Sequence, residues 1–288
     1  GNPIVTPGPV TYSVVQGGFI GTGNINADPL FINPQPASSA PTLSGDYHLQ
    51  KCSPAINAGN NAAVPMGTTT DLDSSLRIAM VTVDMGAYEK LLAKPSPSGI
   101  VYVDHTKNGN GSNWANAVPE LSDALKAAYY DNTIQQIWTA TGTYMPAYFP
   151  LTLSCDGANQ RDKTFLIVNN VKLVGGFAGG ETDTAARDFI ANETILSGDI
   201  GIAANHTDNS YHVLLASGAA GNGGIDGFTI THGQADVSTN FTLNGNIVYN
   251  NYGAGMYVHS ASPFLSHCRF MNNYASGNGG AFAAINSN

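Results

Sequence analysis

Short apolar runs, each about as long as one β-strand, recur throughout residues 100–288. Every run ends at or near Gly, Asn, Asp or Ser, which are residue types that favour turns and terminate strands. Only one stretch, from Pro119 to about Tyr130, has the periodicity of an amphipathic helix. Many short strands and a single helix predict an all-β fold, which leaves a sandwich, a barrel or a solenoid.

An internal repeat near the end of the chain favours the solenoid. Gly255 aligns with Gly280 and Tyr257 with Phe282, at a period of 25 residues. Periods of about 20 to 50 residues are typical of folds in which each repeat buries its apolar face only against its neighbours. In a parallel β-helix, a coil of that length holds about three strands, and the coils stack at the usual strand spacing of roughly 4.8 Å. We therefore predict a parallel β-helix over residues 100–288.

The chain changes character at residues 91–99. This segment contains two prolines, two serines and a glycine, has no periodic pattern, and is predicted to be an extended linker. Upstream, residues 1–90 are rich in turn-forming residues and contain only a few short apolar runs. We predict three parts: a small cap region of β-strands and loops over residues 1–90, the linker, and the β-helix that follows it.

Charge is scarce, and its balance is acidic. Lys and Arg total 11 and Asp and Glu total 20, which gives a formal net charge of −9, and charged residues make up 11% of the chain where about 25% is usual. So few cations argue against binding to nucleic acid and against electrostatic attachment to a membrane. No apolar run approaches the roughly 18 residues of a membrane-spanning helix, so we predict no direct membrane insertion. The three cysteines are far apart and odd in number, which predicts no disulfide framework.

The segment FMNNYASGNGGAF, which starts at Phe270, resembles the FxxN…GGA repeat of polymorphic outer-membrane proteins and related right-handed β-helix proteins of bacterial surfaces. Phe270, Asn273 and the Gly279–Ala281 triplet stand at the signature positions of that repeat. Stretches within residues 101–199 are similar to the start of such a β-helix. The resemblance implies a right-handed parallel β-helix whose open N-terminal end is capped by the predicted helix.

Residues 24–89 resemble the choice-of-anchor Q region, which lies at the carboxyl end of β-helices in secreted, surface-anchored bacterial proteins. The matching stretches include NINADPLF at Asn24 and SPAINAG at Ser53. One departure is Ser74–Leu76, where the family usually has Gly-Asn-Pro. The resemblance implies that residues 1–90 hold the terminal coil of one β-helix with its cap, and that a second β-helix, cut short, follows the linker.

These resemblances imply a non-catalytic module of an adhesin-like protein, secreted or on the bacterial outer surface, whose faces bind an extracellular glycan or a host or cell-surface protein. The alternative is a fragment of a pectate-lyase-like polysaccharide lyase or glycoside hydrolase whose catalytic coils lie outside this chain. After residue 200 the only Lys or Arg is Arg269, and the only acids are Asp208, Asp226 and Asp236. We therefore predict no catalytic residue. A cluster of Lys or Arg with carboxylates converging on one face would favour the alternative.

Three aromatic residues are candidates for glycan binding. Tyr144, Tyr148 and Phe149 lie in a Pro-containing loop that is long for a simple turn. Exposed aromatic rings on a rigid scaffold provide platforms for sugar rings. The alternative interpretation is that these three rings cover the edge of the core.

A second group of candidates lies in or near the strand predicted over Phe264–Phe270. Strand alternation places His267 and Arg269 on one face and the side chains of Phe264, Cys268 and Phe270 on the other. The simpler interpretation is an apolar inner face with a polar outer edge. The functional interpretation is a ligand site formed by His267 and Arg269 together with His259.

Asp71, Asp73 and Asp84 are the best metal candidates, as ligands of a structural Ca²⁺ ion; no other cofactor is predicted. The residues that follow Asp73 do not match a calcium-binding EF-hand loop. The alternative is that Asp71 and Asp73 stabilise tight turns and that Arg77 pairs with one of them.

The last predicted strand of the β-helix ends at Ile285. An open β-helix end has backbone groups without partners, and such edges attract another strand. We therefore predict head-to-tail self-association, in which the Val10–Val15 segment of the same or a neighbouring chain docks on this end.

Overall fold

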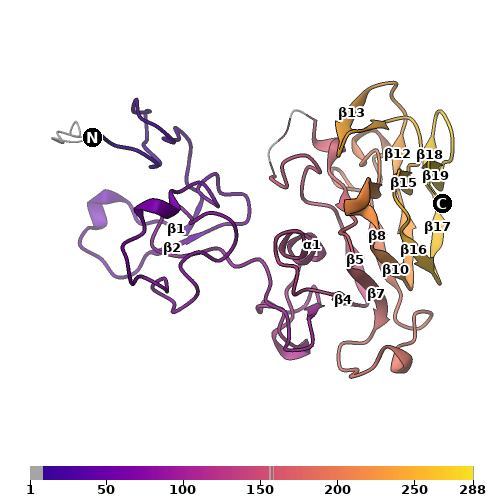
Figure 1. Ribbon diagram of the computed structural model, residues 1–288, viewed down its shortest axis with the longest axis horizontal. Helices are drawn as coiled ribbons and strands as arrows, with labels where there is room; N and C mark the ends of the chain where they lie inside the picture. Colours follow the sequence, from indigo (N-terminus) through magenta and orange to yellow (C-terminus); the bar gives the residue numbers. More distant parts are fainter. Residues whose placement is uncertain (1–8, 156, 158, 288) are drawn as a thin grey trace. The chain divides into compact units, whose positions relative to one another are not determined.

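The computed structural model describes residues 9–155, 157 and 159–287 (Figure 1). The chain divides into two compact units, the first ending at Leu91 and the second beginning at Leu92. Strands predominate, and the described residues contain a single α-helix, α1 (Leu121–Tyr130). The prediction of an all-β fold with one helix is therefore confirmed. No helix in the described part of the chain is long and apolar enough to span a membrane.

The first unit consists mainly of loops. Its two strands, β1 (Phe31–Asn33) and β2 (Asp46–Leu49), pair antiparallel, and two short 3₁₀ turns, η1 (Ala37–Ser39) and η2 (Asn61–Ala63), interrupt the loops. Within the described residues, the Val10–Val15 segment, which is expected to dock on the open end, forms one parallel bridge, between Val14 and Ile25. A small apolar core contains Leu49, Ala55 and Val83.

The second unit is built on three parallel sheets. Sheet 1 contains five strands, which are β3 (Ile100–Val103), β4 (Gln136–Ala140), β7 (Lys172–Phe177), β10 (Gly224–Asp226) and β16 (Phe264–Ser266). Sheet 2 contains four, which are β5 (Gly142–Tyr144), β8 (Thr194–Ser197), β11 (Phe228–Thr231) and β17 (Arg269–Met271). Sheet 3 contains four, which are β6 (Phe165–Leu166), β9 (Leu214–Ser217), β15 (Met256–His259) and β19 (Phe282–Ile285).

From β4 onward the chain passes through sheets 1, 2 and 3 in the same order each time. We call one such passage a round. Two short parallel strands, β12 (Gln234–Ala235) and β18 (Tyr274–Ala275), pair between successive rounds. The β13 (Asn240–Leu243) and β14 (Asn246–Tyr249) strands form an antiparallel hairpin that is inserted before β15.

The core of the second unit is formed by apolar side chains stacked in register from one round to the next. In sheet 1, Leu173 lies beside Ile225, which lies beside Leu265. In sheet 2, Leu196 lies beside Ile230, which lies beside Phe270. Residues paired in a parallel ladder point to the same side of the sheet, so these columns remove a continuous apolar surface from water.

Helix α1 packs against the strands that begin the second unit. Its side chains Leu121, Ala124, Leu125 and Ala128 are buried, which is the face that the sequence periodicity indicates. Its neighbours are β3, β4 and β6. The helix therefore forms where it is predicted, because apolar residues recur at the helical period and give the helix one apolar face.

Three expectations about the second unit are wrong in detail. Met256 pairs with Phe282 and Tyr257 with Ala283, so the repeat between β15 and β19 is 26 residues and not 25. The strand predicted over Phe264–Phe270 is two strands, β16 and β17, in different sheets. Phe264 is not part of the core, because its side chain is 57% exposed.

His267 explains why the predicted strand is divided in two and why Phe264 is not part of the core. Its φ of 48° turns the chain between β16 and β17, so the alternation of inward and outward side chains does not continue across it. The inward residues are therefore Leu265 and Phe270, which stack on Ile225 and Ile230. The cysteine prediction is also wrong in part, because Cys52 and Cys155 each take part in a disulfide bond, whereas Cys268 is free.

Candidate functional site

The three candidate metal ligands in the first unit each have hydrogen-bonding partners within the protein. Asp71 stabilises a tight turn, because its carboxylate accepts hydrogen bonds from the backbone N–H groups of Asp73 at 2.9 Å, Ser75 at 2.8 Å and Glu89 at 2.9 Å. Asp73 has a different partner, His48, whose Nε2 lies 2.6 Å from its carboxylate. The turn expected at Asp71 is confirmed.

Asp84 is held by donors of its own. Its two oxygens accept hydrogen bonds from the backbone N–H groups of Asn57 and Lys90, each at 2.7 Å. The expected pairing of Arg77 with Asp71 or Asp73 is wrong, because Arg77 donates to Glu89 and to the carbonyl of Gly86. Within the described residues, no group of three or more His, Cys, Asp or Glu side chains is placed as metal ligands would be, and the Ca²⁺ site stays a prediction.

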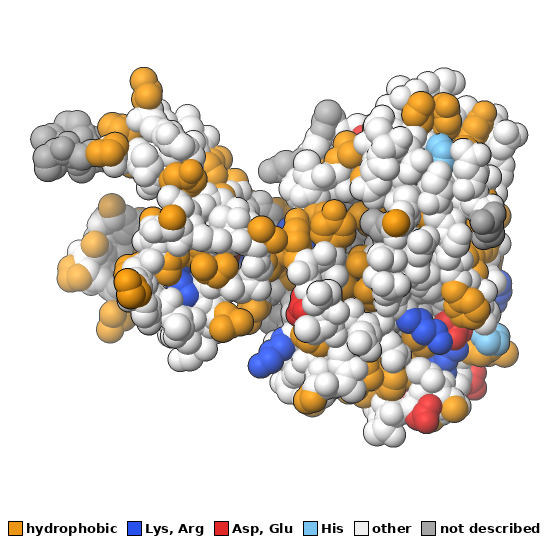
Figure 2. Space-filling view, viewed as in Figure 1, with side chains coloured by type: hydrophobic (Ala, Val, Ile, Leu, Met, Phe, Trp, Pro, Cys, Tyr) orange, Lys and Arg blue, Asp and Glu red, His pale blue; other side chains and the backbone are white. Residues whose placement is uncertain are grey.

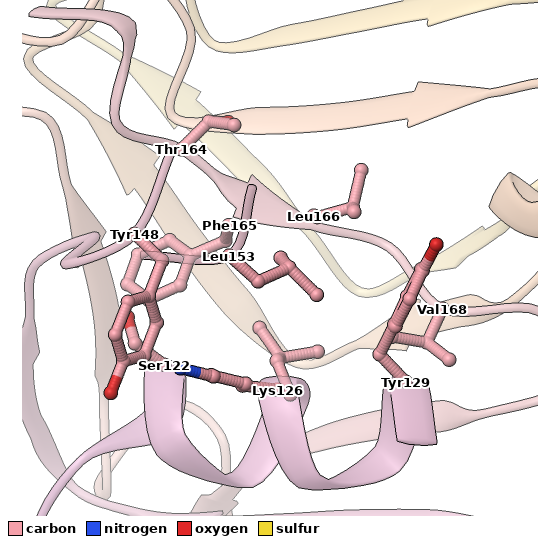
Figure 3. A pocket seen from close by; sticks show the side chains of 10 residues that line it. Ser122, Lys126, Tyr129, Tyr148, Leu153, Thr164, Phe165, Leu166 and Val168 are labelled. Carbon is pink, nitrogen blue, oxygen red and sulfur yellow. The ribbon is translucent and has the colours of Figure 1, made fainter. Parts of the chain in front are cut away.

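The three loop aromatics are buried, so the expectation of an exposed platform is wrong. Tyr144, Tyr148 and Phe149 are only 3%, 3% and 6% exposed. The loop folds back over α1, and Figure 3 shows the Tyr148 ring against the side of the helix that carries Ser122 and Lys126. The Tyr148 hydroxyl donates a hydrogen bond to Asp123, and the Lys126 ammonium lies 4.5 Å from the centre of the Tyr148 ring. The alternative interpretation, that the aromatics cover the edge of the core, is correct.

His259 stands apart from His267 and Arg269. It lies at the end of β15 in sheet 3, where its Nδ1 is 2.8 Å from the Ile247 carbonyl oxygen. The Tyr257 hydroxyl donates to the same oxygen at 2.9 Å. These contacts anchor the β13–β14 hairpin, so His259 serves the structure and does not join the other two residues in one site.

His267 and Arg269 belong to a group of charged side chains at the turn from sheet 1 to sheet 2. We call this group the corner cluster, and it contains Lys172, Arg187, Glu193, Asp226, His267 and Arg269. The cluster combines residues from three successive rounds. Figure 2 shows charged and histidine side chains gathered in one area of the second unit, at the lower right, whereas most of the visible surface is uncharged.

Asp226 is the centre of the corner cluster. Arg187 Nη2 lies 2.6 Å from one of its oxygens, and His267 Nδ1 lies 2.8 Å from the other. The side chains of Asp226 and Arg187 are only 9% and 8% exposed, so this is a buried ion pair. Arg187 also donates to the carbonyl oxygens of Gly175 and Asp226, which satisfies the backbone at the turn.

The cluster sets the protonation state of its central carboxylate. Burial alone would raise the pKa of Asp226. Hydrogen bonds from Arg187 and His267, with the positive charges of Arg187 and Lys172, outweigh burial, and the net effect is a lowered pKa. Asp226 is therefore ionised at neutral pH and holds the surrounding cations in place.

The outer part of the cluster faces solvent. The side chains of Lys172, His267 and Arg269 are 45%, 52% and 65% exposed. Their ion pairs are loose, because Lys172 Nζ is 3.8 Å from Asp226 and Arg269 Nη2 is 3.4 Å from Glu193. Lys172 thus lies exposed beside the buried ion pair and Arg269 lies exposed beside Glu193, and the unused donors of these two cations can bind an anionic group.

His267 occupies a strained position in this cluster. In the preceding round the equivalent position is Gly227, which has a φ of 82°. A side chain at positive φ costs roughly 1–2 kcal/mol, and strained residues of this kind are concentrated at functional sites. Ser260 and Asn272 adopt the same conformation at other turns of this unit, so the backbone conformation of His267 alone assigns no role to its ring.

The sequence did not indicate Lys172, Arg187 or Glu193 as site residues. They lie before residue 200, outside the stretch in which Arg269 is the only Lys or Arg. The only available signal was the rarity of charge itself, since Lys and Arg total 11 in the whole chain. A scan against protein-family models and searches of curated proteins and solved structures found no match.

Proposed function

We propose that residues 100–288 form a right-handed parallel β-helix. The repeated order in which the chain passes through three parallel sheets supports this, and so do the apolar columns between rounds. Right-handedness is the expected sense because almost all crossovers between parallel strands are right-handed. The Asn273 amide supports the stacking: it donates to the Ile230 carbonyl at 2.9 Å and accepts from the Gly233 N–H at 2.8 Å in the neighbouring round.

The chain would then serve as a non-catalytic module of an adhesin-like protein, secreted or exposed on a bacterial surface, that binds extracellular glycan or a host or cell-surface protein. This proposal is based on the resemblance of residues 24–89 and 270–282 to surface proteins. A stacked β-scaffold supports it physically, because parallel strands held in register give rigid faces for side chains that bind a ligand.

The observation that carries the proposal further is a pair of exposed cations in the corner cluster, which are Lys172 beside the buried Asp226–Arg187 ion pair and Arg269 beside Glu193. An anionic group of a glycan, such as a uronate carboxylate or a sulfate, would compete for these cations, whose present partners are 3.8 and 3.4 Å away. With Nδ1 held by the Asp226 carboxylate, His267 Nε2 would accept a hydrogen bond from a hydroxyl of the glycan. The ligand class that fits the corner cluster is therefore an acidic glycan.

Binding of polygalacturonate and heparin by the full chain tests this proposal. Lys172→Ala and Arg269→Ala should each weaken binding about fivefold, which corresponds to about 1 kcal/mol for one exposed ion pair. Lys107→Ala is the matched control, because Lys107 is exposed and lies outside the cluster. Equal binding by all three variants, or no binding of either polymer, would refute the acidic-glycan assignment.

A second function, polysaccharide lyase activity, is favoured by one observation: the cluster joins Lys and Arg with carboxylates and a histidine. Because Asp226 holds Nδ1 of His267, Nε2 is left to accept a proton. In that reaction Nε2 takes the proton from the carbon beside a uronate carboxylate, the glycosidic C–O bond breaks, a C=C bond forms, and water protonates the departing oxygen.

An absorbance assay for the unsaturated uronate product separates the two functions. The binding function predicts a flat signal on polygalacturonate and alginate. A rising signal that is lost in His267→Asn would replace the non-catalytic proposal with a lyase. Asn is the suitable replacement because it tolerates positive φ, so the turn between β16 and β17 is kept.

A further inference from the structure

A second surface feature lies at the opposite ends of the sheet 2 strands. It is a wide, open hollow of about 580 Å³ near the ends of β11 and β17, and it is lined by His206, His232, Gln234, Asn272, Asn273 and Tyr274. The volume is within the range of small-molecule sites, about 300–1,000 Å³. The corner cluster contributes none of these residues.

The floor of the hollow is fixed by hydrogen bonds to the main chain. The Asn273 side chain bridges the Ile230 carbonyl and the Gly233 N–H, which hold it in one orientation. His232 has a φ of 61°, and its Nδ1 faces the hydroxyls of Thr231 at 3.3 Å and Ser197 at 3.4 Å. The ring nitrogen Nε2 of His232 is left for a ligand.

The wall of the hollow combines an amide with an exposed aromatic ring. Gln234 in β12 and Tyr274 in β18 are direct neighbours in a parallel ladder, so their side chains lie on the same side. The Tyr274 side chain is exposed at 54%, and its hydroxyl makes no hydrogen bond to the described part of the chain. His206 lies in η6 (His206–Asp208), and its ring centre is 6.4 Å from that of His232.

The chemistry of the lining selects a class of ligand. None of the six lining residues is an Asp, Glu, Lys or Arg, and their side chains offer amide, hydroxyl and imidazole groups for hydrogen bonds. A sugar ring needs donors and acceptors for its hydroxyls and an aromatic face for its C–H surface, and the hollow has both. We propose that this hollow binds a neutral saccharide. This inference extends the proposed glycan-binding function to a separate site with a different ligand class.

Titration calorimetry of the full chain with maltose, cellobiose and lactose tests the inference. At least one of these neutral disaccharides should bind, and Tyr274→Ala should weaken that binding about tenfold because the stacking surface is lost. His232→Asn should weaken it less, since Asn keeps the positive φ and one polar group. Tyr129→Ala is the matched control: this tyrosine on α1 is 45% exposed and lies outside the hollow, and its loss should leave binding unchanged.

The two sites are distinguished by crossed variants. Lys172→Ala and Arg269→Ala should leave neutral disaccharide binding unchanged, and Tyr274→Ala should leave polygalacturonate binding unchanged. Neutral disaccharide binding without any binding of acidic polymers would refute the corner cluster proposal alone. The inference is overturned if no disaccharide binds, if Tyr274→Ala binds like the native chain, or if Zn²⁺ binds at His206 and His232 while sugars do not.

Discussion

Arg187 and His212, in the second unit, are two titratable residues whose side chains are buried in the fold. Arg187 is paired with Asp226 at 2.6 Å inside the corner cluster. His212 is 3% exposed and contacts the carbonyl of Gly253 at 3.1 Å through Nδ1. In both cases the energy of the group differs between the folded and the unfolded chain, so changes at these positions have measurable effects on stability.

Arg187→Ala should lower the free energy of unfolding by about 3 kcal/mol. The reason is that truncation leaves the ionised Asp226 carboxylate buried without its main partner, and breaking a buried pair costs roughly 3–5 kcal/mol. Urea unfolding at pH 7 measures the effect. Lys107→Ala, an exposed control, should change stability by less than about 0.5 kcal/mol. A similar small change in both variants would show that the pair contributes little.

Stability should fall in mild acid because of His212. Burial lowers the pKa of His212 from 6.5 to about 4. The unfolded chain binds a proton at this residue below pH 6.5, and the folded chain does not until about pH 4, so acid favours unfolding within this window. Between pH 7.5 and pH 5 the loss should be about 2 kcal/mol. Urea titrations at the two pH values measure it, and His212→Gln should remove this part of the pH dependence; an unchanged slope would contradict the assignment.

At the scale of elements, the second unit is held together by columns of apolar side chains rather than by one central cluster. Ile225 in β10 is fully buried, with Leu173 on one side and Leu265 on the other. Leu265 in β16 has a neighbouring strand on one side only. An aliphatic side chain with neighbours on both sides, such as Ile225, therefore contributes more to stability than one with a neighbour on one side, such as Leu265.

Ile225→Ala should destabilise the chain by about 3 kcal/mol, since it removes a buried side chain and leaves a cavity between two neighbours. Leu265→Ala should cost clearly less, because the partly exposed end of the column can relax. Guanidinium unfolding of both variants makes the comparison. Equal losses of unfolding free energy would mean that Leu265 is packed as tightly as Ile225, which would contradict stabilisation by stacked columns.

Among the secondary-structure elements, sequence patterns predicted the helix α1 correctly and the strand over Phe264–Phe270 wrongly. The amphipathic stripe predicted α1 because helical periodicity is a local property of ten or so residues. Alternation failed over Phe264–Phe270, because a single left-handed residue, His267, divides the run between two sheets. Apolar residues on either side of such a turn obey separate alternations, and the pattern alone does not locate the turn.

At the scale of the whole molecule, the last round has free strand edges. Within the described residues, β16, β17 and β19 each pair with one strand only, while Phe264 and Phe282 are 57% and 40% exposed. Unpaired edges with apolar side chains favour association. We expect concentration-dependent head-to-tail self-association, which light scattering across a dilution series measures.

Phe282→Lys should shift this association toward monomer, because a charged side chain beside the β19 edge opposes strand pairing. Lys107→Ala should have no effect. A native chain that stays monomeric at every concentration would refute the self-association proposal. The Val10–Val15 segment forms only one bridge, Val14 to Ile25, so it carries less strand character than the sequence analysis predicted for a docking partner.

The sequence by itself determined the strand-length runs, the turns between them and the single helix, because these depend on residues that are close along the chain. Only the tertiary structure decided which side chains meet. Lys172, Asp226 and His267 lie in three different rounds, and loops of unequal length set the register between them. The same reason explains the burial of Tyr148, which depends on how its loop folds over α1. Such contacts depend on long-range packing, which no local pattern records.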